Sequence, residues 1–228
     1  MHLKIFCKTN EILNKKQYTL SILDIFFMKK IFIFIVGSIF FIQFSYSQRK
    51  EMFKAFEDTL VKLHKEILLE KNTIIKYQKN EGLLYLLEEV LGQRNSIQYP
   101  FDSLKTISVL TSPDKKVRLF TWYLIDDDGF YDHFGYIQAY NESKKRYMIY
   151  PLIDKWKQLV MPESKRLDYL SWFGAVYYQI IKTETYQKTY YILLGWNGGN
   201  IFSQYKVIDV LSFNNRGRKK SVHTWAGS

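Results

Sequence analysis

The chain contains 228 residues, of which 33 are Lys or Arg and 22 are Asp or Glu, so its formal net charge is +11. This length suffices for one domain with a sizeable hydrophobic core. The one cysteine, Cys7, excludes a disulfide framework and a metal site built from several thiolates.

An export signal begins at Met28 instead of at the first residue. The segment MKKIFIFIVGSIFFIQFSYSQ places two lysines before an apolar run and small residues, Ser45 and Ser47, before Gln48. This is the layout of a cleaved secretory signal peptide, and the apolar run is shorter than the roughly 20 residues of a membrane anchor. We therefore predict a signal peptide at residues 28–47, cleavage after Ser47, and a soluble periplasmic or secreted protein without stable membrane insertion.

Residues 1–27 have no clear role beside this signal, and we interpret them as an over-extended N-terminus; a long leader is the alternative. The basic excess is concentrated at the two ends of the sequence. Residues 1–47 carry six lysines and two acids, and residues 214–228 carry four basic residues and no acid. With the export signal, this distribution argues against a nucleic-acid partner.

Residues 49–92 have the pattern of helices. Five apolar residues recur at spacings of three and four, which predicts one buried stripe: Phe53, Phe56, Leu60, Leu63 and Ile67. Glu57 and His64 fall off this stripe, and we expect them on the other faces. A second helix is predicted at Glu81–Leu91, and Gly92 is placed to end it.

Residues 104–213 have the pattern of strands, because β-branched and aromatic runs alternate with turn-forming clusters. The predicted strands are Ile107–Leu110, Val117–Ile125, Phe134–Tyr140, Arg146–Leu152, Phe173–Thr183, Lys188–Gly195 and Tyr205–Phe213. Short connections favour antiparallel neighbours. We predict one α+β domain at residues 48–213, with N-terminal helices packed on an antiparallel sheet of about six or seven strands. The basic tail, residues 214–228, is expected to be disordered or non-native.

Two predicted strands, Phe173–Thr183 and Lys188–Gly195, are apolar on both faces. Strands of this kind are covered on both sides. One face can pack on the helices. The other face then meets a second sheet layer or presents aromatic rings to a partner.

The motifs of this half resemble a group of uncharacterised exported proteins of Bacteroidota. The resemblance runs from about Phe101 to Phe213 and is carried by PFDSLKTISVLTSPDKKVRLFTWYLIDDDGFYDHFGYIQAY, WFGAVYYQII, TYYILLGWNGGN and KVIDVLSF. It implies a periplasmic or surface location and brings no activity with it. The relatives continue after LSFNNRG with glycine and apolar residues, so the last eleven residues are expected to be non-native.

No HExxH, GxSxG, SxxK or CxxC pattern follows the leader, and we predict no metal and no cofactor. The acidic turn DDDG is the strongest group of carboxylates. A calcium loop needs alternating ligands and a closing Glu, whereas these acids are consecutive and the closing position is Ile137. The acid–base candidates for a hydrolase acting on an envelope or extracellular polymer are Asp126, Asp128, Asp132 and His133.

Aromatic residues on the strands support the other hypothesis, a binding or structural module. Rings on neighbouring strands stack on sugars or pack against peptides at low entropic cost. The candidates for a glycan or peptide face are Trp122, Tyr178, Tyr190 and Trp196. The alternative is that the same rings fill a second core layer.

We expect the exported protein to begin at Gln48, because the small residues before it form a signal-peptidase site. N-terminal sequencing and the intact mass of the exported form check this prediction. Recovery of the full-length chain embedded in a membrane would contradict it.

Overall fold

The computed structural model describes Lys30, Phe34, residues 48–186, 188–200 and 202–213, and the backbone of Ser221–Gly227. The chain divides into two compact units, Met1–Met52 and Phe53–Ser228. In the first unit, the described residues are helical. Apart from Lys30 and Phe34, the predicted leader and the over-extended N-terminus lie outside the described residues. Within the described part of the chain, no helix combines the length and apolarity that crossing a bilayer requires.

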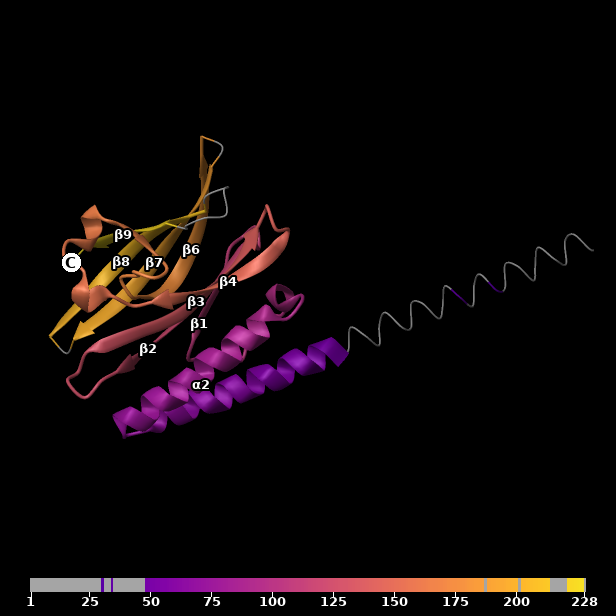
Figure 1. Cartoon of the computed structure of the whole chain (residues 1–228), viewed down its shortest axis with the longest axis horizontal. Helices are drawn as coiled ribbons and strands as arrows, with labels where there is room; N and C mark the ends of the chain where they lie inside the picture. The colour runs from indigo at the N-terminus through magenta and orange to yellow at the C-terminus, as the bar shows by residue number, and fades with distance from the viewer. Residues whose placement is uncertain are drawn as a thin grey trace, which may run out of the picture. The chain divides into compact units, whose positions relative to one another are not determined.

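The second unit begins with two helices that lie side by side (Figure 1). The first helix covers residues 53–69, and α2 covers Thr73–Gly92. Asn72 caps α2, because its side chain accepts the N–H of Ile75 at 3.1 Å. The first helix buries the predicted residues Phe53, Leu60 and Ile67. Contrary to prediction, it buries Glu57 and His64 on the same face, which gives a stripe with heptad spacing.

Among the residues that the structure describes, nine strands form two antiparallel sheets. The first sheet has the order β1-β2-β3-β4 and the second has the order β5-β9-β8-β7-β6. The first comprises β1 (Ser108–Thr111), β2 (Val117–Ile125), β3 (Tyr131–Asn141) and β4 (Arg146–Ile153). The second comprises β5 (Arg166–Asp168), β6 (Val176–Thr185), β7 (Lys188–Asn200), β8 (Ser203–Ser212) and β9 (Ser221–Gly227). The described connections also contain short 3₁₀ helices: η1 (Ser96–Gln98), η2 (Trp156–Gln158) and η3 (Pro162–Ser164).

The predicted α+β class, with helices preceding antiparallel strands, is confirmed. The strands are shared between two sheets instead of forming one sheet of six or seven. The tail differs from expectation, because the backbone of Ser221–Gly227 pairs with both β8 and β5. Residues 214–220 lie outside the described part of the chain.

The first sheet is the middle layer of the fold, with the helices on one face and the second sheet on the other (Figure 1). Alternation along β2 shows both contacts. Phe120 and Trp122 belong to the core beneath the helices, whereas Val117 and Leu119 belong to the core between the sheets. The second sheet thus covers the face of the first sheet that lies opposite the helices. β6 and β7 belong to this second sheet, so the expectation that the helices pack on one face of these two strands is wrong.

A buried arginine joins the helices to the middle layer. Arg118 on β2 is 1% exposed, and its guanidinium donates to the carbonyls of Ser96 and Tyr99 at 2.8 and 2.6 Å. It also donates to the side chain of Gln138 at 2.9 Å. The side-chain amide of Gln138 and the hydroxyl of Ser96 both bind the carbonyl of Leu91, near the end of α2. These side chains satisfy carbonyls that the helix end leaves open.

A buried glutamate on the first helix, Glu57, binds the segment between α2 and β1. Glu57 accepts the hydroxyl of Tyr99 and the N–H of Ser103, both at 2.6 Å. The ring of Tyr99 stacks on Phe53 with centroids 5.3 Å apart. The segment between α2 and β1 is therefore fixed to the first helix and to the sheet.

We expect Arg118→Met to lower the free energy of unfolding by about 3–5 kcal/mol, because it removes the guanidinium that binds the carbonyl of Tyr99 and the side-chain oxygen of Gln138. Urea denaturation measures the change. Arg94→Met is the matched control, since Arg94 is exposed just beyond α2. A loss below about 1 kcal/mol for Arg118→Met would show that the network is not needed.

Burial of His64 should make stability fall in acid. Its Nδ1 lies 2.6 Å from the hydroxyl of Thr106, and burial lowers the pKa of His64 to about 4. Between the pKa of about 6.5 in the unfolded chain and the lower pKa in the folded chain, His64 binds a proton only when the chain is unfolded. Stability is therefore lost as the pH falls from 6.5 to about 4, by at most ~3 kcal/mol.

The pH dependence of urea unfolding for His64→Leu against the unchanged protein isolates this contribution, since the carboxylates are common to both. The unchanged protein should lose more stability than the variant across this range. Identical pH profiles for the two proteins would contradict a buried, neutral His64.

Candidate functional site

A groove of about 640 Å³ lies between α2, β3, the end of β4 and the η2 segment. This volume is in the range of ligand pockets. The floor consists of Phe134 and Tyr136 on β3 with their cross-strand partners Ile153 and Pro151 on β4. Because residues paired across strands share a face, these four side chains lie on the face that carries the helices.

α2 lines the groove with a second stripe, distinct from the one that it buries. Its core stripe contains Leu83, Leu87, Val90 and Leu91. Residues at helical spacing on another face reach the groove: Tyr77, Glu81, Leu84, Tyr85 and Glu88. Tyr85 is 73% exposed. α2 therefore carries more large rings than packing on the sheet requires.

An ion-pair network closes one end of the groove. Lys157 of η2 lies 2.8 Å from Asp132 and 3.1 Å from Asp126, and its ammonium is 4.8 Å from the ring centre of Phe130. Burial works to lower the pKa of Lys157, but the hydrogen bonds to Asp132 and Asp126 outweigh it and raise the pKa. Tyr77 donates its hydroxyl to Asp132 at 2.6 Å. Burial and then this bond raise the pKa of Tyr77, so its phenol remains a donor.

The middle of the groove is acidic on the α2 side. Tyr136 donates its hydroxyl to Glu88 at 3.0 Å. Burial, followed by the charge of Glu88, raises the pKa of Tyr136. Glu81 makes no hydrogen bond or ion pair with any residue that the structure describes. The opposite wall carries Lys155, so the two walls differ in charge.

The wall of the groove opposite α2 is formed by residues 154–158 around η2, here called the η2 wall, and Asp154 fixes its position. It accepts the backbone N–H of His133 at 2.9 Å and lies 3.0 Å from the Nδ1 of the same residue. Its other oxygen accepts the N–H of Trp156 at 2.9 Å, and the indole of Trp156 donates to the carbonyl of Tyr131 at 3.0 Å. Gly174 has φ +78° and packs on this carboxylate, where a Cβ would come within 2.6 Å. The wall is thus preformed.

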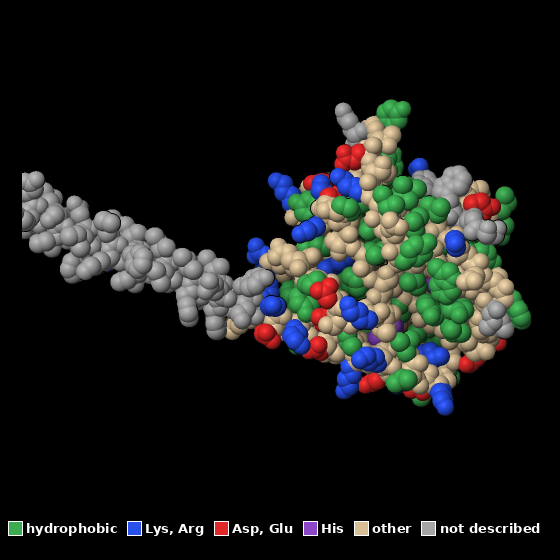
Figure 2. All heavy atoms as spheres, turned by 180° about the vertical axis from the view of Figure 1, so that it is seen from behind, with side chains coloured by type: hydrophobic (Ala, Val, Ile, Leu, Met, Phe, Trp, Pro, Cys, Tyr) green, Lys and Arg blue, Asp and Glu red, His purple; other side chains and the backbone are tan. Residues whose placement is uncertain are grey.

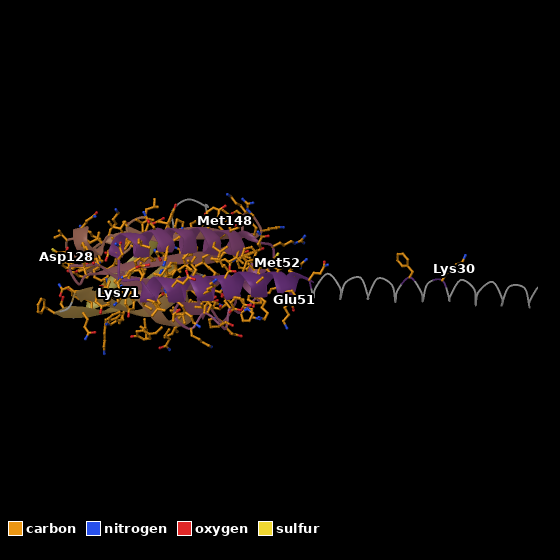
Figure 3. The ribbon with its side chains drawn as sticks, turned by 90° about the horizontal axis from the view of Figure 1, so that it is seen from below. Lys30, Glu51, Met52, Lys71, Asp128 and Met148 are labelled. Carbon is orange, nitrogen blue, oxygen red and sulfur yellow. The ribbon has the colours of Figure 1, made fainter. Side chains whose placement is uncertain are left out.

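The four predicted acid–base residues are not brought together. Asp132 lines the groove, and Asp126 is joined to it through Lys157. Asp126 also accepts the N–H groups of Asp128 and Phe130, which fixes the turn. Asp128 is exposed on that turn. In Figure 3 it lies at the same end of the molecule as Lys71, which belongs to the connection between the two helices.

His133 departs furthest from expectation. β3 begins at Tyr131 instead of Phe134, because Tyr131 pairs with Ile125. His133 therefore alternates with Asp132 along a strand, and its buried ring packs at 6.3 Å from Trp172, on the face turned toward the second sheet. In the described part of the chain, no three His, Cys, Asp or Glu side chains are grouped to hold a metal ion.

The predicted aromatic face is divided between two sheets. Trp122 is 1% exposed beneath the helices, where its indole donates to Asn80 at 2.9 Å. The prediction that it joins the other three rings on one open face is therefore wrong. Tyr190 and Trp196 share the outward face of β7, and Tyr178 on β6 is 58% exposed. Figure 2 shows hydrophobic side chains gathered below the projecting β6–β7 hairpin.

Trp196 does not offer a free flat ring. Its ring meets those of Tyr123 and Tyr131 edge to face, at centroid distances of 5.6 and 5.3 Å. Such T-shaped contacts stabilise a cluster but do not leave a coplanar platform for a sugar.

Sequence reasoning missed the groove residues of α2 and η2. A signal existed on α2, because Tyr77, Leu84 and Tyr85 are apolar at helical spacing outside the core stripe. No signal marked Trp156 or Lys157, which lie in the short polar segment DKWKQ.

Comparison with known proteins adds no assignment. No protein-family model matches the sequence, and neither curated proteins nor solved structures give a significant match.

Proposed function

We propose that this protein is an exported binding module of the bacterial envelope and that it holds a segment of an envelope polymer, a glycan or a peptide, in the groove beside α2. The leader at residues 28–47 and the resemblance to exported Bacteroidota proteins support the location. The groove itself carries the functional proposal, since it combines a floor of rings with walls that bear charge.

The floor suits binding because its side chains are rigid. Phe134 is half-buried and offers an aromatic ring with few rotatable bonds, Tyr136 beside it is only 4% exposed, and Pro151 has no rotamer freedom to lose. Asp154 and Lys157 hold the η2 wall before any ligand arrives. Preformed walls reduce the ordering cost of association.

A hydrolase acting on the same polymers is the second candidate, because four carboxylates line one groove: Glu81, Glu88, Asp132 and Asp154. Glycoside hydrolysis needs two carboxyl groups that act on the substrate. Asp132 is bonded to Tyr77 and Lys157, and Glu88 is bonded to Tyr136. Asp154 is bonded to His133 and the backbone of Trp156. Glu81 alone among the four has no partner in the described chain, so a pair of free carboxyl groups is missing and binding is the better supported function.

Filling the groove should abolish binding. Ile153 is 38% exposed on the groove floor, and Ile153→Trp places an indole in the ligand's space. Ligands selected from glycan arrays and peptide libraries should bind this variant at least about tenfold more weakly, the equivalent of about 1.4 kcal/mol.

The matched control is Ile208→Trp, because Ile208 is 47% exposed on the second sheet and lies outside the groove. This control should leave affinity unchanged. Equal affinity of both variants and the unchanged protein, measured by calorimetry, would place the binding site elsewhere. Failure of both ligand classes to bind the unchanged protein would overturn the function.

A further inference from the structure

The α2 wall of the groove carries negative charge without a compensating cation. Glu81, Tyr85 and Glu88 follow the i, i+4, i+7 spacing and lie one above the other on the helix. Glu88 is held by the neutral phenol of Tyr136, and Glu81 has no partner among the described residues. The ring between them, Tyr85, is exposed.

The lysines of α2 do not neutralise these two carboxylates. Lys76 donates to the carbonyl of Ile125 at 3.3 Å, and Lys79 pairs with Glu70 at 2.9 Å. Both bonds lie at the N-terminal end of the helix. The wall thus keeps two carboxylates and a ring, in a protein with a net charge of +11.

The other two carboxylates of the groove already have partners. Asp132 pairs with Lys157, and Asp154 binds His133 and the backbone of Trp156. Lys155, on the opposite wall, has no acidic partner in the described part of the chain. A complementary ligand therefore presents a cation toward α2 and a hydrogen-bond acceptor toward Lys155.

We propose that the occupant is a polypeptide segment that carries a lysine or arginine, with its cationic side chain between Glu81 and Glu88 and against the ring of Tyr85. The inference rests on the proposed function of the groove and names its ligand class. A carboxylate on each side and an aromatic face are the groups that recognise an organic cation. The methylene stem of the same side chain packs on the ring.

A peptide fits the remaining surfaces better than a neutral glycan. A neutral sugar leaves the charges of Glu81 and Glu88 uncompensated. A peptide backbone offers carbonyls to Lys155, and a neighbouring apolar side chain fits the floor formed by Phe134 and Pro151. Because the carboxylates are exposed, each contributes modestly, and the affinity should weaken with salt.

The test uses the full exported chain and capped synthetic peptides that differ at one central position: Lys, Arg, norleucine or Glu. Calorimetry should show that the Lys and Arg peptides bind about tenfold more tightly than the norleucine peptide. The double variant Glu81→Gln/Glu88→Gln should lose this preference and keep its unfolding midpoint.

Glu66→Gln/Glu89→Gln is the control, because both residues are exposed on the helices, neither lines the groove, and the charge change is the same. Loss of the preference in this control would show long-range attraction and overturn the site.

Ile153→Trp separates the two proposals. If it blocks peptides but Lys and norleucine bind equally, the groove binds peptides and the cation site is wrong. If it blocks glycans and no peptide binds, the groove function stands and the ligand class is overturned. Binding of the Lys peptide that survives Ile153→Trp overturns both proposals.

Discussion

The fold depends on a guanidinium that is buried without a carboxylate. Transfer of an ion from water costs several kcal/mol, and here carbonyls and an amide offset that cost instead of a counter-ion. Arg118 lies between the rings of Phe101 and Phe120, 5.0 and 5.1 Å from their centres. Burial lowers its pKa to about 9, so it remains charged at neutral pH. The network fixes the end of α2 and the segment after it on the first sheet.

The position in which this network holds α2 leaves the end of β4 uncovered, and the groove lies there. Gly92, at the end of α2, lies against Ile149 in the middle of β4, where a Cβ on Gly92 would be 3.8 Å from the isoleucine. The rest of α2 passes beside the floor residues of β3 without covering the end of β4. A site at the border of two layers can be both rigid and open, because its walls are held by the packing on either side.

The local elements and the fold class could be predicted from the sequence, and the division of residues between faces could be predicted only in part. Period and spacing predicted both helices, although α2 starts at Thr73 and not at Glu81, and most strands. They predicted two sheet layers as one alternative, but the helices pack on the first sheet and not on the doubly apolar strands β6 and β7. The prediction failed where one residue of register mattered. Because β3 starts at Tyr131, the neighbours Asp132 and His133 point to opposite faces. Both residues line the groove, but the side chain of His133 is fully buried and its ring packs on Trp172.

The sequence by itself determined the helical and β-rich halves, the antiparallel pairing and the candidate status of Asp132, because these follow from local periodicity and short connections. Only the tertiary structure decided that Trp122 is core, that Glu57 and His64 are buried, and that Lys157 bridges Asp126 and Asp132. It also decided which face of α2 lines the groove. These outcomes depend on contacts between segments far apart in the chain, and no local pattern in one segment records the position of its distant partner.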